Sequence, residues 1–179
     1  EAARATHTML NAVPQRGPFN RGIWKDLECR CGAWANQYGA VWVVAGPVFY
    51  ERKPAGWLGE ADRGERLVAV PDALFKVVIR EAGSGGEAEV LGFIYPQEDP
   101  GYGRGPYSHE RYLASVDSIE VLTGLDFFTV LADAEQEVAE AVRPARLWPV
   151  GEAYFTEGCK QNVPKDVLVS LNTGRMRSW

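Results

Sequence analysis

The residues of this sequence most able to do chemistry together lie in one short stretch, NAVPQRGPFNRGIWKDLE, which covers residues 11–28. Asn20 lies at the N-terminal end of an amphipathic segment, and Glu28 follows eight residues later. Amide and carboxylate oxygens can cap a helix, satisfy backbone groups or hold a hard cation such as Mg²⁺. By local rules alone, Asn20 is an N-cap and Glu28 is a surface carboxylate or the partner of a basic side chain.

A helix over residues 20–38 is the clearest element that would position these two side chains. Apolar residues recur along it at steps of three and four, which places them on one wide stripe. They are Ile23, Trp24, Leu27, Cys31, Trp34, Ala35 and Tyr38. A polar turn over residues 14–18 precedes the helix, and Gly39 is a natural stop. Asn20 and Glu28 would be roughly 12 Å apart along an ideal axis, so we expect no direct contact between them.

The rest of the pattern indicates an α+β fold with a mixed or antiparallel β-sheet core flanked by helices. Residues 6–13 predict an extended entry, and the continuous apolar run 40–49 predicts a buried strand. Residues 50–70 are a long connection rich in charge, Gly and Pro. Two further strands, 74–79 and 90–96, are expected to pair as a hairpin.

Two shorter helices are expected after the strands. Residues 115–124 carry a Ser cap and a closing Gly, and residues 133–142 form a polar, acidic segment. We expect one domain over residues 1–158, followed by a loosely packed tail over residues 159–179. No run of residues is long and apolar enough to span a membrane.

Composition limits the classes of function. The net charge of −5 argues against indiscriminate nucleic-acid binding through a basic surface, although a metal ion could still meet phosphate locally. Cys29 and Cys31 point away from each other on the predicted helix, so either can pair with Cys159 while the other stays free. With no Cys-x-x-Cys pair and two histidines, a structural zinc site is not expected.

Several motifs occur one after another along the chain. They are Asn-x-x-Pro-Gln, Phe-Asn-Arg-Gly-x-Trp-x-x-Leu-Glu, a strand ending Gly-Pro-Val-Phe, VPDALFKVV (70–78), GFIYPQ (92–97) and SVDSIEVLTGLDFF (115–128). In this order they resemble the DNA/RNA non-specific endonucleases, the endonuclease G-like branch of the His-Me finger (ββα-metal) superfamily, so the domain expected over residues 1–158 would be nuclease-like. The resemblance covers roughly residues 6–131. It implies a ββα-metal motif whose metal-binding helix is residues 20–38.

The resemblance also implies roles for single residues. Asn20 would be the only protein ligand of a divalent cation, Mg²⁺ or another such as Mn²⁺. Glu28 would accept hydrogen bonds from metal-bound water, and Asn11 would belong to the supporting polar shell. Gln15 and Arg21 are the candidates for substrate binding. A site with one amide oxygen as ligand and one outer-sphere carboxylate, which contacts metal-bound water, suits Mg²⁺, because this hard ion keeps several of its waters.

The general base of the family, a His in an Asp-Arg-Gly-His motif, is expected some twenty residues before Asn11, where only ten residues precede it. His7 is too close to Asn11 and lacks that context. DRGE at residues 62–65 imitates the motif, but it follows the metal helix and has Glu in place of His, so we interpret it as coincidence.

Three explanations for the absent His remain open. The chain is a C-terminal piece of a longer or processed nuclease, which its start at Glu1 favours. Alternatively the catalytic strand comes as a separate chain, or the protein is a catalytically inactive nuclease-fold module that binds without cutting. The leading hypothesis is a Mg²⁺-dependent, sugar-nonspecific endonuclease that hydrolyses DNA and RNA. A homodimer is a further possibility, and the resemblance suggests a periplasmic or secreted location.

Other polar and aromatic residues have simpler interpretations. His109 lies in a Gly-rich loop and is expected at the surface. Trp24, Trp34 and Trp42 are expected to pack in the core and not to stack on bases. GSGGE, at residues 83–87, lacks the Lys-Ser/Thr of a phosphate loop.

Overall fold

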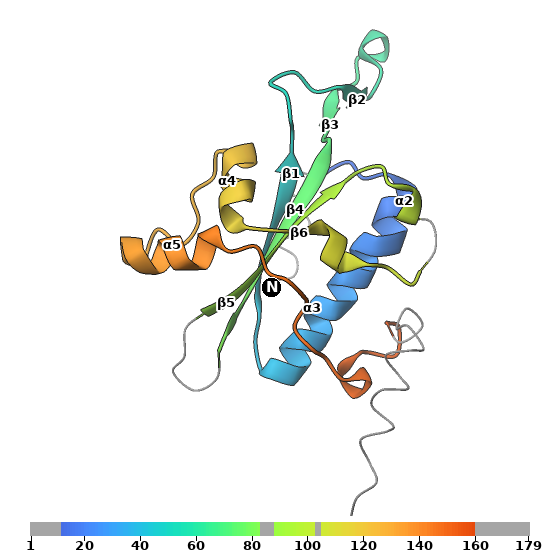
Figure 1. The fold of residues 1–179 in the computed structure, drawn as a ribbon. Coiled ribbons are helices and arrows are strands. Elements are labelled where there is room, and N and C mark those ends of the chain that lie inside the picture. Colours follow the sequence, from blue (N-terminus) through green and yellow to red (C-terminus); the bar gives the residue numbers. More distant parts are fainter. Residues whose placement is uncertain (1–11, 83–87, 103–104, 160–179) are drawn as a thin grey trace, which may run out of the picture.

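A four-stranded antiparallel sheet forms the centre of the protein (Figure 1). The computed structural model describes residues 12–82, 88–102 and 105–159. The strand order is β1-β4-β5-β6, and every neighbouring pair is antiparallel. The strands are β1 (Trp42–Val48), β4 (Ala73–Glu81), β5 (Ala88–Pro96) and β6 (Leu113–Ala114). The α+β class and the predicted β4–β5 hairpin are therefore confirmed.

Both faces of the central strands are covered, because alternate residues of a strand point to opposite sides. Leu74 and Val78 of β4 belong to one apolar cluster, whereas Phe75 and Val77 belong to another. Most of β4 and β5 is buried as a result. The sheet thus has two hydrophobic cores, one on each face.

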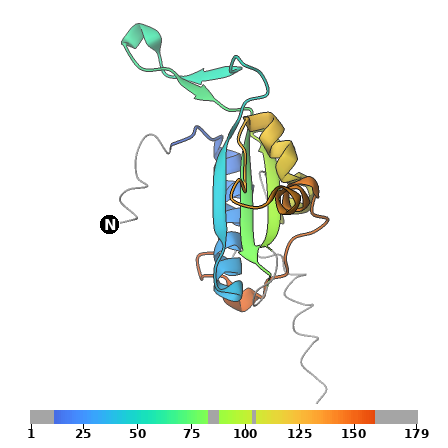
Figure 2. The same cartoon turned by 90° about the vertical axis from the view of Figure 1, so that its left-hand side faces the viewer.

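One long helical rod covers the first face, and two shorter helices lie across the sheet from it (Figure 2). The rod consists of α2 (Gly17–Phe19), a π turn η2 (Asn20–Trp24) and α3 (Lys25–Tyr38). On the other face lies α4 (Val116–Thr123), against which α5 (Asp133–Ala141) packs. Ser115 caps α4 through its side chain and Gly124 ends it with a positive φ of 69°, so both short helices are confirmed.

The connection 50–70 contains a hairpin that the sequence pattern did not reveal. Strands β2 (Gly56–Leu58) and β3 (Val68–Val70) pair antiparallel, with a 3₁₀ turn η3 (Ala61–Arg63) at their tip. Figure 2 shows this hairpin projecting away from the sheet. The strands are only three residues long, and charged residues surround them, so their alternation is too short to detect.

The first strand differs from the expectation of a buried strand over residues 40–49. Strand β1 is an edge strand, and Trp42, Val43 and Val44 are all largely exposed, with Trp42 at 52%. Trp42 is therefore not a core residue, unlike Trp24 and Trp34. An apolar run with many β-branched residues predicts a strand. It does not indicate whether that strand pairs with a neighbour on both sides or lies at the edge of the sheet.

Some expectations concern residues that the structure does not describe. The predicted entry over residues 6–13 is described only from residue 12, where the chain is not a strand, and the tail 159–179 is described only at Cys159. The boundary of the domain at residue 158 stays a prediction. Among the described helices, none is both long and apolar enough to cross a membrane.

Candidate functional site

Asn20 lies inside the helical rod and is not its N-cap. The rod begins at Gly17, and Arg16 before it has an extended backbone with φ −68° and ψ 141°. Asn20 itself is helical, with φ −59° and ψ −48°, and its backbone N–H donates to the Arg16 carbonyl oxygen at 2.9 Å. Pro18 in the first turn suits a helix start. The capping interpretation of Asn20 is therefore wrong, and the helix starts three residues earlier than predicted.

A kink lies between Asn20 and Glu28. It falls at Gly22 within the segment Asn20–Trp24, where two helical pieces of the rod meet. Asn20, Arg21, Lys25 and Glu28 are all exposed, while the residues between them are buried. Asn20 and Glu28 are therefore both exposed to solvent on the rod, on either side of the kink.

Gly22 makes this kink possible. Its backbone has φ −99° and ψ −113°, which is outside the helical region. A methyl group at this position would overlap the carbonyl oxygen of Tyr102 and lie 3.0 Å from the Tyr107 hydroxyl. Tyr102 ends the short turn η4 (Pro100–Tyr102). The glycine therefore lets the loop after β5 pack directly against the turn that carries Asn20.

Glu28 stands above a buried ammonium group. Its side chain is 56% exposed, and its Oε1 lies 3.9 Å from Nζ of Lys76, whose side chain is only 4% exposed. The same Nζ sits 4.0 Å from the centre of the Trp24 ring. Burial lowers the pKa of Lys76, and Cys31 and Glu28 oppose that shift. Lys76 thus places a positive charge beneath the solvent-facing carboxylate.

A second buried network ties the same helix to β5. His109 is fully buried; its Nε2 lies 2.7 Å from Oδ2 of Asp26, and its Nδ1 lies 2.8 Å from the Tyr95 hydroxyl. Arg30 donates to the same Asp26 oxygen at 3.2 Å. Burial lowers the pKa of His109, against the raising effect of its hydrogen bond to Asp26.

The expectation of a surface His109 is therefore wrong. A neutral imidazole would donate from Nε2–H to Asp26 and accept the Tyr95 proton at Nδ1, so both ring nitrogens are engaged. His109 starts the turn η5 (His109–Tyr112), which carries it under the helix. Within the described residues it is the only histidine, and it is sealed from solvent, so it cannot meet a substrate.

The turn before the helix is held by Gln97 from the end of β5. The Gln97 amide donates to the Pro14 carbonyl oxygen at 2.7 Å and accepts the Arg16 backbone N–H at 2.9 Å. Gln15, between them, is half-buried. The exposed Arg21 folds back along the helix, since its guanidinium lies beside Gly17. Gln15 and Arg21 therefore both lie at the Asn20 end of the rod.

Two predicted site features lie apart from this face. Asn11 is outside the described residues, so its place in the supporting shell stays a prediction. DRGE at residues 62–65 lies at the exposed tip of the β2–β3 hairpin, where Arg63 pairs with Glu60 at 2.7 Å. This position supports the interpretation of DRGE as coincidence.

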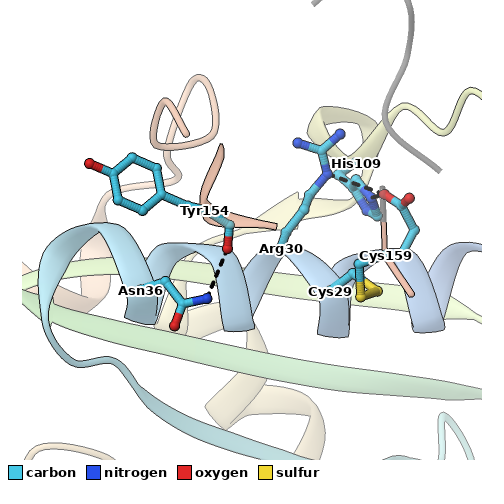
Figure 3. Close-up of a disulfide and its surroundings, with 7 residues drawn as sticks. Cys29, Arg30, Asn36, His109, Tyr154 and Cys159 are labelled. Carbon is cyan, nitrogen blue, oxygen red and sulfur yellow. Dashed lines mark hydrogen bonds and ion pairs between the residues drawn. A yellow bond between two sulfur atoms is a disulfide. The ribbon is translucent and has the colours of Figure 1, made fainter. Parts of the chain in front are cut away.

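A disulfide joins Cys29 of the rod to Cys159, with a Cα–Cα distance of 5.5 Å (Figure 3). The alternative left open by the sequence is thus resolved, and Cys31 is the free thiol. Burial raises the pKa of Cys31 to about 11, so it stays protonated and unreactive at neutral pH.

The face of the rod suits a weakly ligated hard cation. Asn20 offers one amide oxygen and Glu28 one carboxylate, both exposed to solvent. Mg²⁺ prefers oxygen and keeps several waters, so a site with a single protein ligand and an outer carboxylate fits its chemistry. The described residues place no histidine or thiolate on this face, which makes a zinc-type site unsuitable.

Sequence reasoning missed Lys76, Asp26 and the role of His109. A detectable signal existed for the first two. Lys76 interrupts the apolar run LFKVVI, and Asp26 stands three residues after Ile23 within the apolar stripe. An ionisable residue inside an apolar pattern is buried with a partner more often than alone.

The family model described as DNA/RNA non-specific endonuclease matches residues 1–134 of the chain. A mitochondrial nuclease EXOG from Xenopus laevis is 30% identical over 138 residues, which are 73% of this chain and 37% of that protein. Human mitochondrial endonuclease G is 34% identical over 129 residues, which are 68% of this chain and 41% of that protein. A nuclease from a Nostoc species is 33% identical over 132 residues, covering 70% of this chain and 43% of that protein.

A solved structure has a fold similar to that of this chain. The crystal structure of the EndoG/EndoGI complex matches with a TM-score of 0.53 and 23% identity, over 70% of this chain and 51% of that chain. That degree of likeness supports the same fold. The chain spans about two fifths of the length of the curated relatives it matches.

Proposed function

Because the chain belongs to the DNA/RNA non-specific endonuclease family, we propose that it carries the metal-binding half of a phosphodiester-cleaving site. The substrates would be DNA and RNA, cut by a sugar-nonspecific endonuclease that depends on Mg²⁺ or Mn²⁺. The observation that supports this proposal most is the exposure of both Asn20 and Glu28 on one helical segment, with the buried Lys76 ammonium group 3.9 Å from Glu28.

Asn20 would hold the cation through its amide oxygen, and Glu28 would accept a hydrogen bond from a water on it. When bound, the cation would polarise the phosphate and stabilise the leaving 3′ oxygen. Lys76, 3.9 Å from Glu28, keeps a positive charge under that carboxylate and so orients it. Lys76 is a positioning residue in this account.

Substrate contacts would come from the same end of the rod. The exposed guanidinium of Arg21 can pair with a phosphate oxygen, and the amide of Gln15 can donate to the backbone of the nucleic acid. Asn11 would complete the polar shell. Gln97 supports these residues by fixing the backbone on both sides of Gln15.

The general base would come from outside the described residues, on an upstream segment of the same protein or on a separate chain. The sealed position of His109 favours this assignment, since that imidazole is bonded at both nitrogens. The sealed position of His109 is also consistent with a second candidate function, that of a nuclease-fold module that binds nucleic acid without cutting it.

We also propose an oxidising compartment, such as the periplasm or the outside of the cell. The Cys29–Cys159 disulfide supports this location, because disulfides persist where thiols are not kept reduced. Homodimerisation stays a prediction without an assigned surface.

Digestion of plasmid DNA and of RNA with Mg²⁺ tests the proposal, using the chain alone and a version extended upstream. We expect cleavage by the extended form, loss of cleavage on chelation, and a loss of at least a hundredfold in Asn20→Ala. Asn36→Ala is the matched control, because Asn36 lies on the same rod and bonds only the Tyr154 carbonyl oxygen among the described contacts (Figure 3). Cleavage that survives Asn20→Ala would refute the metal-ligand role, and binding without cleavage by the extended form would favour the module.

A further inference from the structure

Three carboxylates from two helices meet on the side of the sheet opposite the Asn20 face. We propose that Asp117, Glu120 and Glu140 form a second divalent-cation site, of the Ca²⁺ class, that fastens α5 to α4. Nothing in the proposed nuclease function uses these residues. The site is independent of Asn20 and Glu28, which lie on the rod across the sheet.

The geometry allows one ion to touch all three side chains. One ligand oxygen from each residue lies within 4.8 Å of those of the other two. Two oxygens bound to the same Ca²⁺ at 2.3–2.6 Å can be up to roughly 5 Å apart. Asp117 is exposed and Glu120 half-buried, so water can fill the remaining positions that Ca²⁺ requires.

A buried, unpaired oxygen points independently to a ligand. Glu140 is only 6% exposed, and its Oε1 has no hydrogen-bond partner in the described part of the chain. Buried carboxylates are normally paired or bound to metal, because an unpaired one is costly. Burial raises the pKa of Glu140, and the nearby carboxylates of Glu120, Asp117 and Asp126 raise it further.

In the part of the chain that the structure describes, no basic side chain forms an ion pair with this cluster. Among the ion pairs of the described residues, none includes Asp117, Glu120 or Glu140. A hydrogen bond with the Gln136 side chain lowers the pKa of Glu140, and the Gln136 amide also donates to Asp126 at 3.1 Å and to the Phe127 carbonyl oxygen at 3.0 Å. A cation would provide the missing counter-charge.

Glu120 is already oriented for such a role. Its Oε1 accepts the Phe127 backbone N–H at 2.6 Å, which fixes the position of the carboxylate near the end of α4. Ca²⁺ fits better than Mg²⁺, because it accepts several carboxylates in flexible geometry, whereas Mg²⁺ holds its waters. The ion would bridge two helices that otherwise bring like charges together.

Thermal unfolding of the 179-residue chain in the Asn20→Ala background tests this site without the proposed catalytic metal. We expect Ca²⁺ at about a hundred times its Kd to raise Tm by about 5–10 °C. Glu140→Gln should abolish the shift and should not lower Tm in chelator. Glu137→Gln is the matched control, since Glu137 is an exposed acid on the same helix outside the cluster, and it should keep the shift.

Three results would overturn the proposal: no shift in the Asn20→Ala protein, an equal shift in Glu140→Gln, or the same shift from KCl at matched ionic strength. If Glu140→Gln does not fold, Asp117→Asn decides the matter, because Asp117 is exposed and its replacement does not disturb the core. A calcium affinity lowered about tenfold in Asp117→Asn supports the site, and an unchanged affinity contradicts it.

Discussion

Lys76 and Glu28 form a pair in which a buried ammonium group, 3.9 Å away, lies directly beneath an exposed carboxylate. The two come from different elements, β4 and α3, that the apolar clusters hold together on one face of the sheet. The pair connects the core of the protein to the proposed metal site. It explains why a lysine interrupts the apolar run of β4.

Replacing Lys76 should impair cleavage without unfolding the protein. Lys76→Met keeps the length and volume of the side chain in a site that is apolar except for Glu28, so we expect Tm to change by only a few degrees. Cleavage by the extended form should fall about tenfold, because Glu28 loses the charge that orients it.

A double-mutant cycle shows whether Lys76 acts through Glu28. In a Glu28→Gln background, Lys76→Met should have little further effect on cleavage. Fully additive effects of the two substitutions would mean that Lys76 contributes in some other way.

Removing the buried imidazole should flatten the dependence of stability on pH. The pKa of His109 is lowered below its ordinary 6.5 in the fold. Just below pH 6.5 the unfolded chain therefore binds more protons than the folded one, and stability falls as pH decreases, by at most about 1.4 kcal/mol per pH unit. Well above pH 6.5 the imidazole is neutral in both states, so His109 contributes no slope there.

Urea unfolding of the protein and of His109→Gln between pH 8 and pH 5 measures this effect. We expect the substitution to cost about 2–4 kcal/mol at pH 8, because it disrupts the bonds to Asp26 and Tyr95. Parallel pH profiles for the two proteins would show that His109 is not the titrating group.

A methyl group at Gly22 should damage both stability and cleavage. It would overlap the Tyr102 carbonyl oxygen, and the backbone must then move away, at a cost of about 1–3 kcal/mol. Because Gly22 lies two residues from Asn20 in the same turn, Mg²⁺-dependent cleavage should fall as well.

Gly32→Ala supplies the matched control for Gly22→Ala. Gly32 is exposed on the same rod, and a methyl group there would meet nothing within 4 Å. It should stabilise the helix by about 0.5–1 kcal/mol and leave cleavage unchanged. Equal behaviour of the two variants in unfolding and cleavage assays would contradict the role given to Gly22.

Loss of the disulfide should lower stability markedly. The bond closes a loop with a sequence separation of 130 residues, so Cys159→Ser should cost about 2–5 kcal/mol in urea unfolding. Reduction with dithiothreitol should reproduce the loss in the parent protein and have no effect on Cys159→Ser. Cys31→Ala, which alters the free thiol, should remain sensitive to reduction.

Local signals were sufficient for much of the fold. Ser115 and Gly124 marked the ends of α4, and two apolar runs separated by a Gly-rich segment indicated the β4–β5 hairpin. These features depend on residues close together in the sequence, so single-sequence rules can find them. The family resemblance added the metal helix and the roles expected for Asn20 and Glu28.

Features that depend on distant partners could not be predicted. His109 lies 83 positions from Asp26 and 14 from Tyr95, and nothing near it in the sequence indicates that it is buried. The helix that carries Asn20 and Glu28 is kinked at Gly22, whereas periodicity arguments assume 3.6 residues per turn throughout. The exposure of Trp42 depends on β1 being an edge strand.

Binding of Mn²⁺ to the chain, followed by electron paramagnetic resonance, tests most directly the claim that Asn20 ligates the metal. The experiment uses the Glu140→Gln background to remove the proposed second site. We predict one saturable Mn²⁺ site that is lost in Asn20→Ala and kept in Asn36→Ala. Equal Mn²⁺ binding by all three proteins would contradict the account.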